Sequence, residues 1–244
     1  VLPNVCPYLF YNKSKLIEIE LNNLDSSNCL FMSSMFQGCS SLINLDLSPI
    51  DMSKNLDMSY MFNRCSNLTY IKFPVDTSNV TDMSNMFSGC SSLTSIVIPN
   101  SVTSIGSSAF SGCSSLASIT IPSSVTSIGE GAFSGTAWLT NEQQGNPLVI
   151  VNGILIDGTT CSGEVTIPND VTRIGVSAFQ KCTNLTSIII PEGVTSIGYS
   201  AFENCSNLAN IEIPSSVTSI GTNAFNGCTA LTEVLLEGNS TLTY

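Results

Sequence analysis

The sequence predicts a solenoid, a fold in which similar coils stack into one array with a parallel β-sheet along one face. Phenylalanine recurs at steps of 26, 26, 25, 23, 23, 46, 23 and 23 residues along the 244-residue chain. Self-similarity at a period of about 20 to 50 residues is typical of repeat architectures, in which one unit alone cannot bury its apolar side chains. The repeating residues are Phe10, Phe36, Phe62, Phe87, Phe110, Phe133, Phe179, Phe202 and Phe225.

Most repeats follow the same template. A cysteine comes three residues after the phenylalanine, a leucine six after it, and apolar residues nine and eleven after it; residues 110–121 show the full pattern. The step of 46 residues is twice 23, so we assign the missing phenylalanine place to Ile156. Val165 and Ile167 follow Ile156 at nine and eleven residues, in register with the template. The pattern therefore indicates about ten units.

Three local elements are expected in each unit. Triplets such as residues 96–98 alternate with period two and are β-branched, which indicates a short strand. A proline often follows and ends the ladder, because it has no N–H to donate. Next comes Val-Thr-Ser-Ile-Gly, as at residues 102–106, a second extended piece. The third element, Ala-Phe-x-x-Cys-x-x-Leu, has apolar residues three apart, which favours a short 3₁₀ segment or a single helical turn.

We expect a single domain over residues 1–244, interrupted near its middle by a β-hairpin. Two candidate strands, 148–151 and 154–157, flank Asn152 and Gly153, a pair that strongly favours a two-residue hairpin turn. The sections are residues 1–86 with longer, methionine-containing units, 87–133 with 23-residue units, 134–157 as the irregular unit with the hairpin, and 158–244 with 23-residue units again.

The composition argues against several functions. The formal net charge of -11 opposes the phosphate neutralisation that drives nucleic-acid binding. The chain has no histidine, which is the usual general base and the commonest metal ligand. No apolar run approaches the roughly 18 residues that span a membrane. We therefore predict no enzyme activity, no cofactor and no metal, and, because Val1 starts no leader pattern, a mature or excised segment.

The repeat text resembles a known family. The phrase IPSSVTSIGxxAFxGCxxLxxIxIP, approximated at residues 211–235 and again near 98–122, is similar to the BspA-like leucine-rich repeats. The variant DTSNVTDMSNMFSGCSSL, at residues 76–93, resembles a sister repeat of the same surface proteins. The resemblance covers nearly the whole chain. It implies a curved leucine-rich-repeat solenoid, secreted or at the cell surface of host-associated bacteria or some protozoa, with a role in adhesion.

The cysteines are expected to fill the core. A metal site would need Cys-x-x-Cys pairs or histidines, which the chain lacks. Stacked neighbours would lie within disulfide range, but their side chains would point the same way, so buried thiols are the interpretation. Core packing is likewise expected for the seven methionines, rather than an adaptable binding groove. The main column holds Cys39, Cys65, Cys90, Cys113, Cys182, Cys205 and Cys228, while Cys6 and Cys29 fall in other columns and Cys161 in none.

The residues eight and ten positions after each phenylalanine flank an inward strand residue, so they point away from the core. This outward column varies in charge, size and polarity while the core columns barely change. We interpret it as a binding surface, because solenoids present such faces to partners. The outward column consists of Glu18 and Glu20, Asn44 and Asp46, Tyr70 and Lys72, Ser95 and Val97, Ser118 and Thr120, Glu164 and Thr166, Ser187 and Ile189, Asn210 and Glu212, and Glu233 and Leu235.

This interpretation predicts a protein partner, such as a host extracellular-matrix protein or another cell-surface protein, and no nucleic acid. Two alternatives stay open: a structural spacer that displays another domain, and an outward column that simply tolerates any residue. A flat ladder of Thr103, Thr126, Thr172, Thr195 and Thr218 could bind ice or a polysaccharide, although hydroxyls suit exposed strand positions in any case. Neither end of the array has a polar cap, so we expect terminal residues or further chain to cover both ends.

Overall fold

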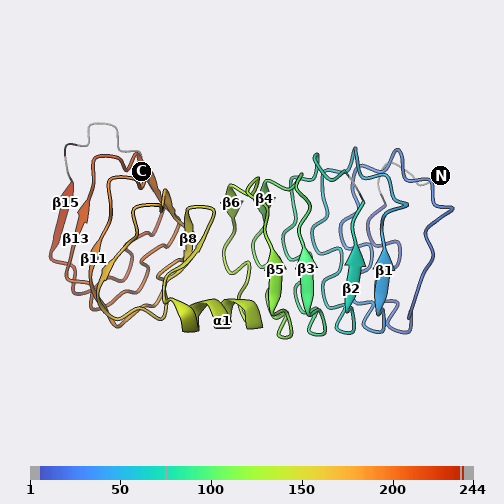
Figure 1. Cartoon of the computed structure of the whole chain (residues 1–244), viewed down its shortest axis with the longest axis horizontal. Coiled ribbons are helices and arrows are strands. Elements are labelled where there is room, and N and C mark those ends of the chain that lie inside the picture. Colours follow the sequence, from blue (N-terminus) through green and yellow to red (C-terminus); the bar gives the residue numbers. More distant parts are fainter. Residues whose placement is uncertain (1–5, 75, 237, 239–244) are drawn as a thin grey trace. The chain divides into compact units, whose positions relative to one another are not determined.

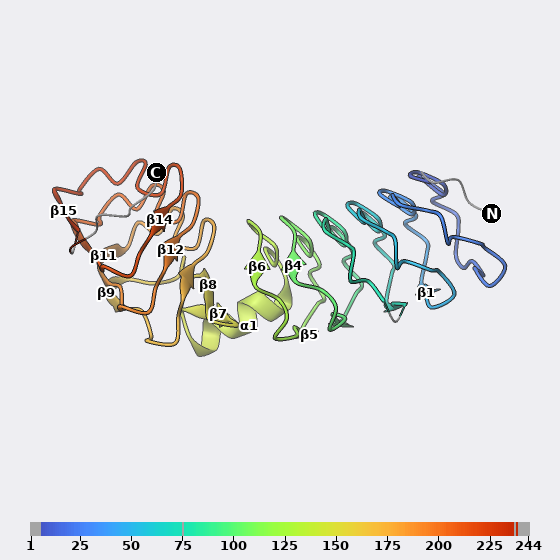
Figure 2. The same ribbon diagram turned by 90° about the horizontal axis from the view of Figure 1, so that it is seen from above.

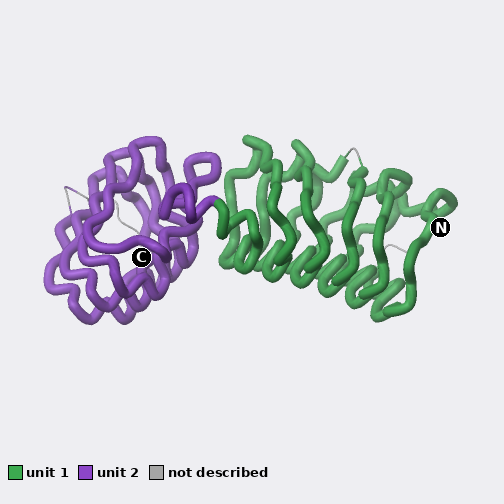
Figure 3. Tube along the Cα trace, turned by 60° about the horizontal axis from the view of Figure 1, so that its bottom comes forward, with its two compact units in different colours: residues 1–141 green, residues 142–244 purple. Residues whose placement is uncertain are grey.

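The computed structural model describes residues 6–74, 76–236 and 238. The chain divides into two compact units, residues 1–141 (unit 1) and 142–244 (unit 2) (Figure 3). Each is a β-solenoid with mostly parallel sheets and little helix, which confirms the predicted fold class. The continuity of one curved array over the whole chain stays a prediction.

Unit 1 carries its main strands along one face of its coils (Figure 1). They pair in parallel, with Leu45 opposite Ile71 and Ile96 opposite Ile119. The middle residue of each strand points inward and its two neighbours are exposed, as the period-two pattern predicts. The main strands are β1 (Asn44–Asp46), β2 (Tyr70–Lys72), β3 (Ser95–Val97) and β5 (Ser118–Thr120), and the Val-Thr-Ser-Ile-Gly segments form β4 (Ser104–Ile105) and β6 (Ser127–Ile128).

Unit 2 contains the predicted hairpin, formed by β7 (Val149–Val151) and β8 (Ile154–Asp157) (Figure 2). Asn152 and Gly153 have φ angles of 50° and 75°, which a tight two-residue turn requires. Two sheets extend through the unit, in the orders β14-β12-β10-β8-β7 and β15-β13-β11-β9. The other strands are β9 (Gly163–Thr166), β10 (Arg173–Ile174), β11 (Leu185–Ile189), β12 (Ser196–Ile197), β13 (Asn210–Ile213), β14 (Ser219–Ile220) and β15 (Glu233–Leu236).

A helix that the sequence pattern did not predict, α1 (Ala137–Gly145), lies in the irregular section. Thr136 caps it, because its Oγ1 accepts the N–H of Leu139 at 3.1 Å. None of the nine helical residues is fully buried, so the segment has no apolar stripe that periodicity could detect. The helix was missed for this reason.

The Ala-Phe-x-x-Cys-x-x-Leu segments are hydrogen-bonded turns in the described part of the chain, not the 3₁₀ or helical turns that we expected. Alternate N–H groups leave the segment, since Phe110 donates to Ala132 of the next coil at 2.7 Å while Cys113 donates back to Phe110 at 3.1 Å. Residues with positive φ, such as Ser108 at 54°, stop helical propagation. Bonds between coils therefore replace the bonds within a helix.

Stacked phenylalanine rings form the centre of each unit. In unit 1 the rings from Phe10 to Phe133 stack at centroid distances of 5.1–5.7 Å, and in unit 2 Phe179, Phe202 and Phe225 stack at 5.1 and 5.5 Å. Offset stacking of this kind adds to the free energy gained by burying large apolar rings. Trp138 packs against Phe133 in an edge-type contact, with the ring centroids 4.8 Å apart, and ends the unit 1 stack.

Gly158, and not Ile156, holds the missing phenylalanine place. The N–H of Gly158 donates to the Ala178 carbonyl at 2.7 Å, which is the bond that Phe179 and Phe202 make to the next coil. The Sγ of Cys182 donates to the Gly158 carbonyl. In the same way, the Sγ of Cys205 donates to the carbonyl of Phe179, the phenylalanine of the preceding coil. A Cβ atom at residue 158 would overlap the ring of Phe179, so glycine fits where a larger residue does not.

Cys161 consequently belongs to the cysteine column, which corrects its assignment outside the columns. It follows Gly158 by three residues and donates its N–H to the Gly158 carbonyl at 3.0 Å. The coil is shortened after this point, because Glu164 lies six residues beyond Gly158, whereas its partner Ser187 lies eight beyond Phe179. Sequence spacing placed the strand correctly and misplaced the turn.

The other column cysteines are free thiols, and all except the half-buried Cys228 are buried, as predicted. Burial raises the pKa of Cys65 and of Cys113 to about 12, so these thiols stay protonated at neutral pH. A disulfide joins Cys6 and Cys29, whose Cα atoms lie 6.4 Å apart, so the expectation of thiols is wrong for this pair. The two residues belong to different columns, so the parallel orientation expected within one column does not apply to them. All seven methionines are buried, which confirms core packing.

Short aspartate turns account for much of the acidity of the chain. Seven aspartates accept the backbone N–H of the serine or threonine two residues later, at 2.7–3.1 Å. Such turns satisfy backbone donors where the coil changes direction. The serine hydrogen bonds, with the side-chain bond the largest cause, lower the pKa of four of these carboxyl groups, those of Asp25, Asp46, Asp51 and Asp76.

We expect Gly158→Ala to lower the free energy of unfolding by about 1–3 kcal/mol, because the added methyl group must displace the Phe179 ring. Urea denaturation followed by circular dichroism measures this change. Gly145→Ala is the matched control, since nothing lies within 4 Å of a Cβ atom there. Equal midpoints for the two variants would contradict the assignment of Gly158 to the phenylalanine column.

Alkylation of the denatured, unreduced protein should label eight cysteines, because two of the ten are joined in the disulfide. Mass spectrometry counts the labels, and prior reduction should raise the number to ten. Labelling of two or fewer residues without reduction would show that the column thiols pair with one another.

Stability should fall as the pH drops below about 4, because the folded pKa of the four aspartates lies below their unfolded value. Ionised aspartate stabilises the fold above the unfolded pKa, and this contribution disappears as the pH falls through the folded pKa. Replacing Asp51 and Asp76 together by Asn, whose side-chain oxygen accepts the same bond without titrating, should reduce the difference between urea midpoints at pH 7 and pH 3. Asp170→Asn serves as the control, and an unchanged difference in the double variant would refute this explanation.

Candidate functional site

The outward column lies where the sequence predicted it. Every residue of the column is exposed except Ser187, which is half-buried. The strand alternation is the cause, because the residue between the two outward positions points toward the core, as Leu45, Ile71 and Ile211 show. The structure divides the column between the sheet face of unit 1 (Glu18 to Thr120) and the sheet face of unit 2 (Glu164 to Leu235).

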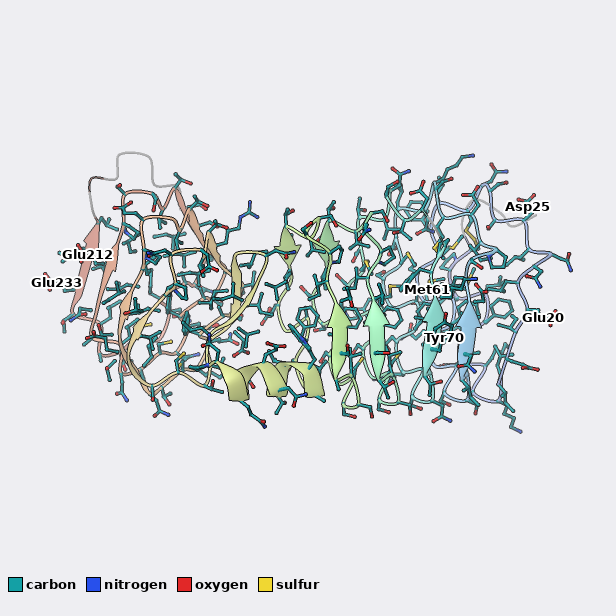
Figure 4. The ribbon with its side chains drawn as sticks, in the orientation of Figure 1. Glu20, Asp25, Met61, Tyr70, Glu212 and Glu233 are labelled. Carbon is teal, nitrogen blue, oxygen red and sulfur yellow. A yellow bond between two sulfur atoms is a disulfide. The ribbon has the colours of Figure 1, made fainter. Side chains whose placement is uncertain are left out.

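Five residues of the predicted column meet in one hollow of unit 1. This N-terminal hollow has a volume of about 300 Å³, and Figure 4 labels Glu20 and Tyr70 on its walls. Neighbouring coils build it, since Asn44 of β1 pairs directly with Tyr70 of β2. Its lining consists of Ile17, Glu18, Ile19, Glu20, Ile43, Asn44, Leu45, Asp46 and Tyr70.

The N-terminal hollow combines apolar surface with negative charge. Ile17 and Tyr70 are 58% and 55% exposed, unusually high values for large apolar side chains. Glu18 and Glu20 have no hydrogen bond or ion pair within the described residues, so their carboxylates are available to a partner. The hollow thus offers apolar contact beside unpaired negative charge.

Asp46 and Lys72 form an exposed ion pair at the edge of this hollow, with Nζ 3.1 Å from Oδ2. Lys72 also donates to Ser48 Oγ at 3.1 Å. The hydrogen bonds from Ser48 come first among the causes that lower the pKa of Asp46, followed by the contribution of Lys72. Exposed pairs of this type contribute about 0–1 kcal/mol, so the pair orients Lys72 more than it stabilises the fold.

Ile17 and Ile43 were missed as site residues. They lie seven positions after Phe10 and Phe36, one position before the predicted outward column, and the Ile43 N–H donates to the Ile17 carbonyl at 3.2 Å. The signal was present in the sequence, because the same position holds threonine or alanine in the next three repeats. Two adjacent isoleucines at a position otherwise filled by small residues indicate an apolar patch.

The sheet face of unit 2 is more regular. Ile189 of β11 pairs with Glu212 of β13, which pairs in turn with Leu235 of β15. Ile189 and Leu235 are about half exposed, and Figure 4 shows Glu212 and Glu233 on the last two strands. The predicted mixture of apolar and acidic residues is therefore present here as well.

The hydroxyl ladder is less available than a ligand platform requires. Thr195 Oγ1 donates to the Thr172 carbonyl at 3.1 Å, and Thr218 Oγ1 donates to the Thr195 carbonyl at 3.2 Å. These hydroxyl groups join successive coils. Their donors are engaged in the fold, which weakens the idea of a ligand ladder.

The described part of the chain contains no cluster of three or more His, Cys, Asp or Glu side chains able to hold a metal ion. Within the same residues, no helix has the length and apolar character needed to cross a membrane.

The coil geometry and the repeat text agree with a known family. A family model described as the BspA type leucine rich repeat region matches residues 2–84, 83–148 and 158–244. The chain belongs to the BspA-type leucine-rich repeat family. The expected resemblance is thereby confirmed.

Several solved leucine-rich-repeat structures are similar to this family member, while no curated protein matches it. A leucine rich cell surface protein from Faecalibacterium prausnitzii is 24% identical, with 88% of this chain and 78% of that chain covered and a TM-score of 0.38. A leucine-rich repeat protein from Bacteroides ovatus is 20% identical, with 99% and 73% covered and a TM-score of 0.47. The T. pallidum Leucine Rich Repeat protein is 30% identical, with 62% and 61% covered and a TM-score of 0.33.

Proposed function

We propose that this chain is a non-enzymatic module that binds other proteins outside the cell or at a cell surface, with unit 1 supplying the main contact. The gathering of five predicted outward residues with Ile17 and Ile43 around the N-terminal hollow carries this proposal. A concave site with apolar walls and a few polar groups suits recognition of a side chain or a short segment. The more uniform hydroxyl-rich face of β3 and β5 lacks this combination.

The partner chemistry follows from the charge. Glu18 and Glu20 are unpaired in the described structure and the chain carries a net charge of -11, so a partner with Lys or Arg beside apolar residues fits the hollow. An extracellular-matrix protein or another surface protein is the proposed class.

Two observations support an extracellular location. The disulfide between Cys6 and Cys29 is typical of oxidising compartments. One structural relative, from Faecalibacterium prausnitzii, is described as a cell surface protein.

The charge reversals Glu18→Lys and Glu20→Lys, made together, should weaken binding to the partner about tenfold or more without changing the thermal midpoint. A panel of immobilised fibronectin, laminin and collagen, read by surface plasmon resonance, tests this expectation. Binding should also weaken as salt rises from 0.05 to about 0.5 M, because the charges are exposed.

The matched control reverses Glu164 and Glu212 on the sheet face of unit 2, which changes the net charge by the same amount. Equal losses for both double variants would indicate nonspecific electrostatic attraction and would contradict a site at the hollow. If no panel member binds the unmodified chain above the reversed variant, the module is better explained as a spacer.

A further inference from the structure

Around the repeating phenylalanines, the backbone hydrogen bonds between successive coils all run in the same direction. In every described repeat from Phe10 to Phe110, and again at Phe179 and Phe202, three N–H groups point to the following coil. They belong to the phenylalanine itself and to the residues two before and two after it. Phe202 donates to Ala224 at 2.8 Å, flanked by the bonds from Ser200 to Thr222 at 3.0 Å and from Asn204 to Asn226 at 2.7 Å. Along this stretch each coil shows carbonyl groups to the coil before it and N–H groups to the coil after it.

The last coil of unit 2 carries the three N–H donors, but no following coil supplies carbonyl acceptors among the described residues. The N–H groups of Asn223, Phe225 and Gly227 occupy the same three places, and none has an acceptor among the described residues. In the same coil, β15 and β14 are the edge strands of the two sheets of unit 2. An uncovered edge of this kind is a template for pairing with further backbone.

An apolar hollow of about 390 Å³ opens on this end of unit 2, and its lining includes Ile220, Phe225, Val234 and Leu236. Val234 and Leu236 are 44% and 49% exposed, whereas Ile211 and Ile213, their neighbours one coil earlier, are 2% and 0% exposed. The difference shows how much apolar surface a following coil would remove from water.

At the end of unit 1, the equivalent phenylalanine ring is packed differently. Phe133, the last ring of its stack, is only 3% exposed, and Trp138 packs against it. Phe225 is half-buried, although Phe202 beneath it is fully buried. No aromatic side chain of the described residues takes the role of Trp138 at Phe225.

We propose that the end of unit 2 formed by residues 220–236 is a docking surface for a further coil of the same repeat template, supplied by polypeptide other than residues 1–244. In that coil, the carbonyl groups of the residues three before, one before and one after its phenylalanine accept the three N–H groups. The phenylalanine ring of the same coil stacks on Phe225. A parallel strand paired with β15 completes the contact. This interaction is independent of the sheet face invoked for partner binding.

A second copy of this chain fits the surface poorly. In a two-fold pairing the three donors of one copy would face the three donors of the other. In a head-to-tail pairing the first coil would supply carbonyl groups, but Lys13 stands in its cysteine place and would become buried. Glu18 would also lie beside Glu233, and like charges directly opposite destabilise a strand pair.

Amide hydrogen exchange of the full chain tests the docking surface. In the unmodified protein, the amides of Asn223, Phe225 and Gly227 should exchange at least about a hundredfold faster than those of Ser200, Phe202 and Asn204. Inserting a second copy of residues 214–236 directly after Leu236, with Glu→Ser at the copied Glu233 so that no like charges face each other, supplies the proposed coil. The three fast amides should then become as protected as their counterparts, and the thermal midpoint of the protein should rise.

The control insertion is identical except for Phe→Asp at the copied Phe225 and Leu→Asp at the copied Leu236, and it should give no protection. Equal protection by both insertions, or by neither, would overturn the proposal. Protection in the unmodified chain that rises with protein concentration would show that a second copy covers the surface. Protection that is independent of concentration would show that the chain covers its own end, which also refutes the proposal.

Discussion

The backbone hydrogen bond to the following coil, made by the repeating phenylalanines from Phe10 to Phe110 and by Phe179 and Phe202, is the interaction on which the structure depends. It fixes the distance between coils, and the aromatic rings stack as a consequence at 5.1–5.7 Å. Because alternate N–H groups bond between coils, the intervening segments are turns and not helices. The same ladder aligns the thiol, leucine and strand columns, so the whole core repeats with the phenylalanine.

The unusual composition follows from this arrangement. A coil that changes direction several times has many backbone donors to satisfy, and aspartate followed two residues later by serine or threonine satisfies one of them locally. Repetition then multiplies aspartate, serine and threonine along the chain. The glutamates are placed differently from the turn aspartates. Several of them lie exposed on the sheet faces, where Glu18 and Glu20 are unpaired in the described structure. Part of the acidity is thus structural, and part is available for recognition.

The outward column could be read from the sequence because strand alternation is local: once Leu45 and Ile71 point inward, their neighbours must point outward. Which of these residues form a hollow could not be read in this way. That depends on the curvature between coils and on Ile17 and Ile43, which lie outside the period-two pattern. The hairpin at Asn152 and Gly153 was predictable from turn chemistry, whereas α1 was not, because it presents no apolar face.

The sequence by itself determined the repeat, the content of the core columns and the orientation of the strand residues, since each of these follows from periodicity within one coil. Only the tertiary structure decided which residues occupy equivalent places when a coil changes length. Gly158 takes the phenylalanine place, although residue counting selects Ile156. Hydrogen bonds between coils align backbone positions in space, and a shortened loop after Cys161 changes the residue count without disturbing that alignment. The disulfide between Cys6 and Cys29 was also decided in three dimensions, because it joins residues of different columns.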